Sequence, residues 1–217
     1  MKYIDMESWP RRKHFEVFNG FDYPHFNVCA DVEVTELQAA FKGVSASFTL
    51  GLTYALARAA NSIPEFRYRI REGRVIEYDV VHPSITILLE DETFSFCTLK
   101  YVDDFPEFIQ DSEKIVSRVK ENPVLADEPG QDDLLYMTSI PWISFTGFMH
   151  PIHMHPVDSV PRIAWGKIFQ KDSSLYMPLS VQGHHGLMDG LHAGRYFARV
   201  QELLDRPEAF VEARKSG

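Results

Sequence analysis

Cysteine is scarce in this sequence: its 217 residues contain only two, Cys29 and Cys97. Two thiols cannot form the disulfide framework that stabilises small secreted domains, and no Cys-x-x-Cys pair offers the usual spacing of a structural zinc site. The sequence therefore predicts two reduced thiols in a reducing compartment.

Long apolar runs are absent as well. No stretch approaches the ~18 consecutive apolar residues that a membrane helix requires, and residues 1–16 are polar and charged, unlike the apolar core of a secretory signal. We therefore expect a cytoplasmic protein with no membrane partner.

Positive charge is in the minority, with 22 Lys and Arg residues against 31 Asp and Glu residues and a formal net charge of -9. Nucleic-acid binding needs clustered basic side chains, and the best basic run, residues 11–13, is short and lies close to Glu16. The composition thus argues against a nucleic-acid partner. Its hydrophobic share of 45% suits one compact domain with a sizeable core, and we expect residues 1–217 to form a single domain.

Hydrophobic periodicity predicts both helices and strands. Apolar residues recur at helical spacing in residues 48–59, which Pro64 closes, in residues 106–121 and in the segment after Asp189. The acidic stretch 122–133, with two prolines and a glycine, predicts a loop. Alternating or β-branched runs predict strands at 28–34, 75–81, 84–89, 134–138, 142–145, 162–165 and 175–181. This mixture of helices and strands predicts an α/β or α+β two-layer domain.

The most informative segment is QGHHGLMDG at residues 182–190, where the pattern HHxxxDG joins a predicted strand to a predicted helix. At this composition the pattern would arise by chance on the order of one time in a thousand. Histidine suits general-base chemistry because its unperturbed pKa of ~6.5 leaves it able to accept a proton near pH 7. Asp189 can cap the helix, and Gly190 relaxes the backbone there. From these residues alone, a buried histidine pair beside an ordinary capping aspartate stays open as an alternative.

The HHxxxDG segment resembles that of the acyl-CoA-dependent acyltransferases, which include chloramphenicol, dihydrolipoyl and carnitine acyltransferases. A narrower resemblance to the chloramphenicol acetyltransferase family (type A) lies in four further segments. They follow in order over nearly the whole chain: WPRRKHFE at 9–16, ETFS at 92–95, PWISF at 141–145 and MPLSVQ at 177–182.

This resemblance implies an α+β two-layer sandwich, with a mixed β-sheet covered by helices, and a homotrimer with active sites at the subunit interfaces. It implies acetyl transfer from acetyl-CoA, a co-substrate and not a bound cofactor, to a small-molecule hydroxyl, with chloramphenicol as the family's acceptor. His185 corresponds to the general base of a direct attack. Thr138 stands where the family has a serine that stabilises the oxyanion, and Asp189 and Arg11 match an ion pair that shapes the site.

The same resemblance assigns pocket residues and shows where this chain departs from the family. Lys167 matches a CoA-binding position, whereas Ser47 and Thr49 replace a lysine and a tyrosine there. Ala164 replaces a threonine that holds a water near the intermediate. Asp22 and Pro24 also depart from the family, which has apolar or small residues in contact with the acceptor at these positions. The departures on the acceptor side predict a changed acceptor preference with an unchanged reaction. The acceptor positions are Phe18 (for tyrosine), Phe94, Thr86, Tyr136 (for asparagine), Phe148, His150 (for an apolar residue) and Ile152.

Other interpretations stay open. The chain could acetylate a different small hydroxyl or amine, or it could sequester a ligand with little turnover, although retention of both His185 and a hydroxyl at residue 138 argues against the latter. A dihydrolipoyl acyltransferase core is disfavoured by the WPRRKHFE segment and by the lack of a lipoyl domain or flexible linker. His150, His153 and His155 form an HxxHxH pattern, but no carboxylate or cysteine supports it, and we predict a polar pocket wall and no metal.

Overall fold

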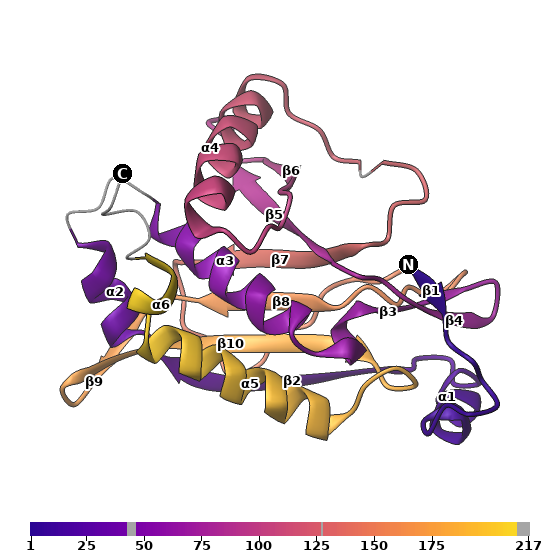
Figure 1. Ribbon diagram of the computed structural model, residues 1–217. Coiled ribbons are helices and arrows are strands. Elements are labelled where there is room, and N and C mark those ends of the chain that lie inside the picture. The colour runs from indigo at the N-terminus through magenta and orange to yellow at the C-terminus, as the bar shows by residue number, and fades with distance from the viewer. Residues whose placement is uncertain (43–46, 127, 212–217) are drawn as a thin grey trace.

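A computed structural model describes residues 1–42, 47–126 and 128–211 of the chain (Figure 1). The helices are α1 (Arg12–Phe18), α2 (Thr35–Phe41), α3 (Phe48–Asn61), the short 3-10 helix η1 (Pro64–Arg67), α4 (Phe105–Glu121), α5 (Gly190–Asp205) and α6 (Glu208–Val211). The strands are β1 (Lys2–Tyr3), β2 (His25–Glu33), β3 (Tyr68–Arg71), β4 (Arg74–Glu77), β5 (His82–Leu88), β6 (Phe94–Thr98), β7 (Leu134–Ile140), β8 (Arg162–Gly166), β9 (Phe169–Lys171) and β10 (Ser174–His184).

The main sheet joins strands from both halves of the chain. Hydrogen-bonded neighbours follow the order β2-β10-β8-β7-β5-β6, and β9 pairs with β10. β7 runs parallel to β5 and β8, whereas β10 runs antiparallel to β2 and β8. Helices α3 and α5 lie across one face of this sheet (Figure 1). A mixed sheet covered by helices confirms the predicted fold class.

The two faces of the main sheet differ in chemistry because side chains alternate along each strand. On β10, Leu179 and Val181 belong to the hydrophobic core beneath the helices. Ser180, Gln182 and His184 point to the opposite face, which we call the polar face. Strand register places further polar side chains of neighbouring strands on it: His25, Asn27, Ser84, Thr86, Tyr136, Thr138 and Arg162.

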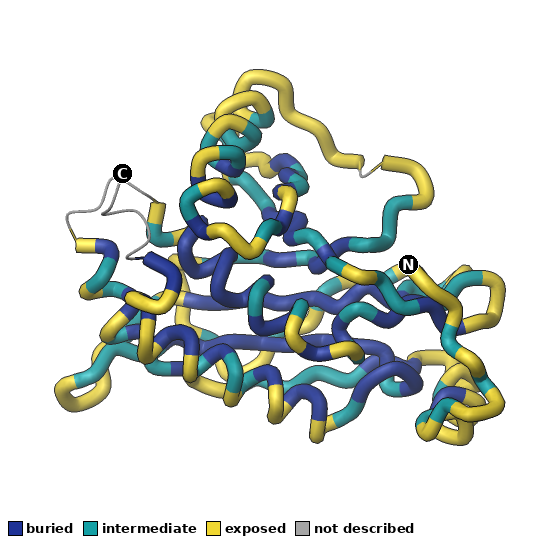
Figure 2. The backbone as a smooth tube through the Cα atoms, viewed as in Figure 1, coloured by how far each residue is buried: buried dark blue, intermediate teal, exposed yellow. Residues whose placement is uncertain are grey.

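The core lies between the helices and the sheet. Figure 2 shows buried backbone running along the central strands and along α3. Ten of the 14 residues of α3 are buried, because this helix packs against the sheet, α4 and α5 at once. Small side chains permit that approach: a Cβ added at Gly51 would lie 2.0 Å from Cζ of Phe41. Close packing of α3 therefore depends on a glycine in the middle of a helix.

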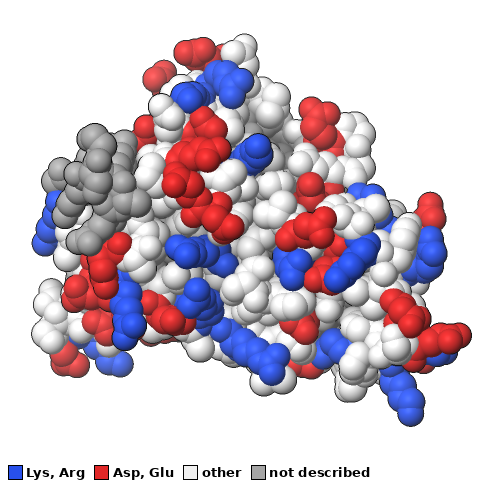
Figure 3. Space-filling model, viewed as in Figure 1, with Lys and Arg blue, Asp and Glu red and all other residues white. Residues whose placement is uncertain are grey.

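The surface that carries α3 and α5 is polar, with acidic and basic side chains interspersed over it (Figure 3). None of the helices within the described ranges is long and apolar enough to cross a membrane.

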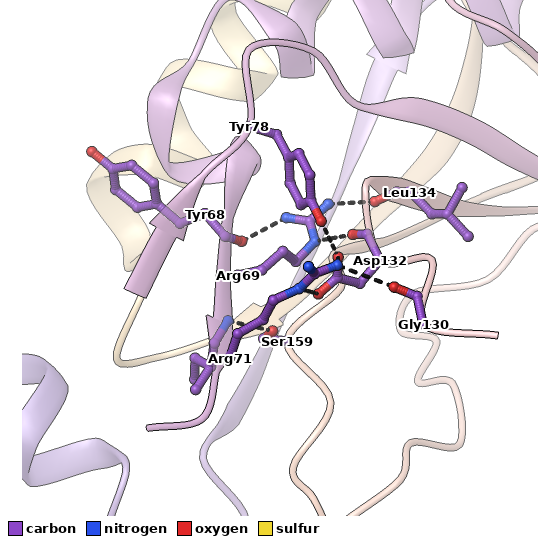
Figure 4. Close-up of polar contacts among 9 residues, drawn as sticks. Tyr68, Arg69, Arg71, Tyr78, Gly130, Asp132, Leu134 and Ser159 are labelled. Atoms are coloured by element: carbon purple, nitrogen blue, oxygen red, sulfur yellow. Dashed lines mark hydrogen bonds and ion pairs between the residues drawn. The ribbon is translucent and has the colours of Figure 1, made fainter. Parts of the chain in front are cut away.

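A buried arginine fixes the small sheet β1-β4-β3 to the main sheet (Figure 4). The Arg69 side chain is fully buried, and its guanidinium donates to the carbonyl oxygens of Asp132 (2.6 Å) and Leu134, at the start of β7, besides two in its own segment. Burial lowers the pKa of Arg69 to about 10, so the group stays charged at neutral pH. Arg71 adds a two-pronged contact to the Asp132 carboxylate, with Nε at 3.0 Å and a terminal nitrogen at 2.6 Å. The start of β7 is therefore held from outside its own sheet.

Two predicted strands differ from the observed ones. The run 75–81 was predicted as one strand, but β4 ends at Glu77 and β5 begins at His82. The amide of Tyr78 donates to the Arg67 carbonyl and that of Val81 to Oδ1 of Asn61, so the chain crosses between two sheets inside one β-branched run.

The predicted strand at 142–145 is wrong, because this segment forms a turn and an extended loop. Trp142 is 64% exposed, and its apolar neighbours do not line the core. The carbonyl of Ile143 instead accepts a hydrogen bond from Lys167 N at 2.8 Å, and the segment passes directly over Gly166. The apolar residues of this segment predicted a strand, but they belong to a loop that covers the end of β8.

The remaining predicted elements are confirmed within a few residues. The helical segments correspond to α3, α4 and α5, and residues 122–133 form a loop in their described part. Sequence periodicity missed α1 and α2, which are seven residues each and too short to show a full helical pattern.

Gly51 yields the first prediction. Replacing a helical glycine by alanine ordinarily stabilises a helix by roughly 0.5–1 kcal/mol, but at Gly51 the new methyl group collides with the Phe41 ring. We expect Gly51→Ala to destabilise the fold by roughly 1–3 kcal/mol in denaturant unfolding. Gly194→Ala on α5, where nothing lies within 4 Å, is the matched control and should stabilise. Equal effects of the two substitutions would contradict this packing.

Candidate active site

His185 lies in the turn between β10 and α5. Its amide donates to the carbonyl of Pro24 at 2.7 Å. Its ring stacks on Phe18, with centroids 3.9 Å apart and planes 6° from parallel, and touches Phe26 at 5.0 Å. Backbone and ring are thus both held, while the residue stays partly exposed. Nδ1 of His185 is buried, and the described residues supply it with no hydrogen bond.

Arg11 and Asp189 form an ion pair behind His185. A terminal nitrogen of Arg11 lies 2.5 Å from Oδ2 of Asp189, and the other donates to the His185 carbonyl at 3.2 Å. Burial raises the pKa of Asp189, but the hydrogen bond and the charge of Arg11 outweigh it and lower that pKa to about 2. The structure therefore brings together two residues 178 positions apart that were predicted to pair.

Asp189 also begins α5. Its Oδ1 accepts from the amide of Leu191 at 3.0 Å, and Nδ1 of His192 lies 3.1 Å from the amide of Asp189. Nε2 of His192 lies 3.2 Å from a carboxylate oxygen of Glu65, so the polar contacts of Asp189 extend through His192 to the η1 helix. The capping role of Asp189 could be predicted from the sequence, whereas His192 and Glu65 gave no signal.

His184 points to the polar face and packs against His25, with ring centroids 5.4 Å apart. Nδ1 of His184 accepts from the amide of Gly186 at 3.1 Å, and Nε2 of His25 donates to the Asp158 carbonyl at 2.8 Å. Burial, reinforced by His25 and His185, lowers the pKa of His184 to about 4, and burial also lowers that of His25. This pair is neutral at pH 7 and structural.

A second cluster surrounds Thr138 on β7. Nε2 of His150 lies 3.3 Å from Oγ1 of Thr138, and the Phe148 ring meets that of His150 edge-on at 4.7 Å. Tyr136, two residues before Thr138, lies beneath the guanidinium of Arg162, 5.1 Å from the ring centroid. The structure thus brings Thr138, Tyr136, Phe148 and His150 together on the polar face and the loop over it.

The loop that carries Phe148 and His150 is tied to the polar face. The Phe148 carbonyl accepts from Nδ2 of Asn27 at 2.8 Å and from Oγ of Ser180 at 3.0 Å. Oε1 of Gln182 accepts from the amide of His150 at 2.8 Å. Neighbouring strands therefore position the loop. Sequence reasoning missed Asn27, Ser180 and Gln182, whose only signal was their alternation with core residues.

Of the other predicted site residues, two lie on the polar face with Thr138, and the rest lie at the edge of the sheet, in loops or at the start of α3. Thr86 shares the polar face, and Ala164 pairs with Thr138 and is fully buried. Phe94 is 48% exposed at the start of β6. The remaining positions are Ile152, half-buried in the loop, and Lys167, Asp22, Ser47 and Thr49, all exposed, with Ser47 and Thr49 at the N-terminus of α3.

The His185 and Thr138 clusters lie far apart within one chain. His184 is four residues from Ser180 along β10, and Ser180, Ala164 and Thr138 are in register across β10, β8 and β7. At ~3.4 Å per residue and ~4.8 Å per strand, the Cα atoms of His184 and Thr138 are roughly 17 Å apart. The His185 ring also contacts Phe26, which packs on the helix-covered side. One small reacting group cannot contact His185 and Thr138 of the same chain.

No group of three or more His, Cys, Asp or Glu side chains within the described ranges is arranged to hold a metal. His153 and His155, the remaining members of the HxxHxH pattern, are exposed, and only His150 of the three is directed into the Thr138 cluster.

Comparison with known proteins identifies similar sequences and folds. The family model described as chloramphenicol acetyltransferase matches residues 1–201. A chloramphenicol acetyltransferase of a Klebsiella species is 30% identical over 205 residues, which are 93% of either chain. A solved chloramphenicol acetyltransferase superposes with a TM-score of 0.86 at 30% identity, covering 94% of this chain and 100% of that one. The dihydrolipoamide acetyltransferase of Azotobacter vinelandii shares the fold at 21% identity, with a TM-score of 0.69 over 92% of this chain and 88% of that one.

The buried histidines predict how stability depends on pH. Because the folded-state pKa of His184 is depressed to about 4, the unfolded chain binds more protons than the folded chain between about pH 6.5 and pH 4. The stability contributed by neutral His184 is therefore complete above pH 6.5 and is lost as the pH falls through this window, by roughly 3 kcal/mol in total.

We expect the free energy of unfolding to fall less between pH 7 and pH 4.5 in His184→Asn than in the wild type, measured by urea unfolding. Asparagine keeps an acceptor for the Gly186 amide and removes the titrating ring. His14→Asn, at an exposed position on α1, should keep the wild-type fall. An unchanged fall in His184→Asn would rule out this origin of acid sensitivity.

Proposed function

The chain belongs to the chloramphenicol acetyltransferase family and is an acyltransferase, and we propose that it transfers the acetyl group of acetyl-CoA to a hydroxyl of a small-molecule acceptor. Chloramphenicol, for which its relatives are named, is the acceptor we propose first, with antibiotic resistance as the resulting role. The observation that carries the proposal is the arrangement of His185: its imidazole is stacked on Phe18 and partly exposed, and its backbone carbonyl accepts a hydrogen bond from Arg11 of the Arg11–Asp189 ion pair.

The proposed reaction is a direct attack with His185 as general base. Because Nδ1 of His185 is buried, Nε2 meets the acceptor, whose hydroxyl donates to Nε2 and thereby selects the tautomer that carries the ring proton on Nδ1. Nε2 removes the hydroxyl proton as the oxygen forms a bond to the thioester carbonyl carbon. The carbon–sulfur bond of the tetrahedral intermediate then breaks, and the proton passes from the imidazolium to the CoA thiolate. No acyl-enzyme forms, and acetyl-CoA is a co-substrate rather than a resident cofactor.

Arg11 and Asp189 shape the site in this proposal and do not relay the proton. The low pKa of Asp189 keeps its carboxylate charged throughout the working pH range, so it accepts no proton from the acceptor. Arg11 neutralises that charge and, through the His185 carbonyl, holds the turn that carries the base. A buried carboxylate without such a partner would be costly.

We propose that the Thr138 hydroxyl stabilises the oxyanion and that this threonine belongs to the subunit next to the one that supplies His185. The distance between the two clusters supports a site made by His185 of one protomer and Thr138 of the next, in the homotrimer implied by the family. Exposed apolar side chains in the loop over the polar face, Trp142 and Met149 among them, suit such an interface. In this proposal residues 1–217 of each subunit form one acetyltransferase domain, and the enzyme acts in the cytoplasm.

We propose that the acceptor binds at the Thr138 cluster. His150 contacts this hydroxyl, and we assign the acceptor wall to Phe148, Tyr136, Thr86, Phe94, Phe18 and Ile152 as well, and the CoA contact to Lys167. His150 introduces a polar ring where the family has an apolar residue, and Asp22 is a charged departure from the family on the acceptor side. These changes favour weak turnover of chloramphenicol or a preference for a more polar hydroxyl or amine acceptor, because burying polar groups against an apolar ligand is costly.

The base is tested by comparing His185→Ala with His184→Ala. We expect His185→Ala to lower kcat by several orders of magnitude while acetyl-CoA binding persists, because only the proton acceptor is lost. His184→Ala should lower stability more than kcat, because its ring packs on His25. Release of the CoA thiol measures transfer, first with chloramphenicol and then with a panel of hydroxyl and amine acceptors. Equal, modest losses of kcat in both variants would refute the assignment.

The shared site is tested by mixing two inactive variants. Thr138→Ala should lose about 10²–10³ in kcat. Refolding it with His185→Ala in equal amounts should restore about a quarter of wild-type activity, because about three quarters of random trimers contain both variants and each has one intact site of three. Single-variant samples refolded alongside are the controls. If activity stays at the sum of the two controls, His185 and Thr138 act within one chain.

A further inference from the structure

His150 contacts the hydroxyl that is proposed to stabilise the oxyanion. Its Nε2 lies 3.3 Å from Oγ1 of Thr138, and both residues belong to the same chain. The loop after β7 turns back over its own strand to make this contact. A wall residue needs only to fill space, whereas this ring presents a polar atom to a reacting group.

The backbone that carries His150 is held by three side chains, and its ring packs on Phe148. Oε1 of Gln182 accepts from the backbone amide of His150 at 2.8 Å, and Nε2 of Gln182 lies 3.4 Å from the backbone carbonyl oxygen of His150. Asn27 and Ser180 both donate to the carbonyl of Phe148, two residues before. The Phe148 ring then packs edge-on against the imidazole, at an interplanar angle of 86°. The backbone position of His150 is therefore fixed, and Phe148 packs against one side of its ring.

The position of the ring proton follows from burial. Burial, with a smaller effect of Arg162, lowers the pKa of His150 to about 4, so its imidazole is neutral at pH 7 and carries one N–H. Nδ1 is buried and meets no hydrogen-bond partner in the described part of the chain. An orphaned buried N–H is rarer in proteins than an unfilled acceptor, which favours the proton on Nε2.

We infer that His150 is a positioning residue for the Thr138 hydroxyl: Nε2–H donates to Oγ1, so that the hydroxyl proton of Thr138 turns away from His150 and toward the oxyanion. A donor to Oγ1 also polarises the hydroxyl and strengthens its own donation. No proton is transferred in this arrangement. The inference rests on the proposed function of Thr138 and gives His150 a role beyond the acceptor wall.

The tautomer can be measured without any turnover. In the unliganded protein labelled with 15N-histidine, long-range 1H–15N correlation spectra at pH 7 distinguish the two neutral tautomers of each ring, and His150→Gln identifies the His150 signals. We expect His150 to be neutral with its proton on Nε2. A proton on Nδ1 would make Nε2 the acceptor of the Thr138 hydroxyl, which would tie up the catalytic proton, and would overturn the inference.

A double-mutant cycle tests the action through Thr138. We expect His150→Leu to lower kcat about five- to tenfold in the wild type, the size of one lost hydrogen bond, while KM for an apolar acceptor stays equal or falls. In the Thr138→Val background the same substitution should change kcat less than twofold, because no hydroxyl remains to orient. His150→Gln, whose side-chain amide retains an N–H donor, should restore most of kcat.

His153→Leu, an apolar replacement of an exposed histidine in the same loop, is the matched control and should show no coupling to Thr138. An equal loss of kcat from His150→Leu in both backgrounds would show a packing role only and would overturn the inference. If the wild type acetylates no acceptor at all, the proposed function fails; the tautomer measurement still decides whether His150 donates to Thr138.

Discussion

The pairing of β10 with strands on both of its sides is the constraint on which the rest of the molecule depends. β10 is antiparallel to β2 over nine residue pairs and to β8 over four, so its register is fixed from both edges. A shift by one residue would move Leu179 and Val181 out of the core and bury Gln182 beneath the helices. The same register aligns Ser180, Ala164 and Thr138 in one row and directs the end of the strand into the turn that carries His185.

The width of the sheet separates the two clusters of the candidate site. His185 lies where β10 meets α5, supported by Arg11, which directly precedes α1, and by Phe18, whereas Thr138 lies on β7, two strands away. Arg69 fixes the start of β7 to the small sheet, which holds the hydroxyl side independently of the turn that holds the base. Each cluster is held by its own contacts within one chain, and the proposed assembly needs only to bring the two clusters together.

The histidines show how environment decides the chemistry of one residue type. His184 and His25 lie deep in the polar face, where burial keeps both rings neutral. His185 is one residue away, yet its ring lies on the aromatic surface of Phe18 and remains partly exposed. His150 is neutral for the same reason as His184 but contacts a hydroxyl. The last residue of β10 and the first residue of the following turn thus place their rings in different environments, because their side chains point in different directions.

The sequence by itself determined the features that depend on neighbouring residues: the α3, α4 and α5 segments, most strands, the Asp189 cap, and the HHxxxDG segment whose resemblance led to the family and to the pairing of Arg11 with Asp189. Tertiary structure alone decided the strand order, the division of residues 75–81 between two sheets and the loop at 142–145. It also decided that His150 meets Thr138 and that Asn27, Ser180 and Gln182 hold it there. The physical reason is that periodicity shows which side of a strand is apolar, whereas its partners across the sheet are set by contacts between residues distant in sequence.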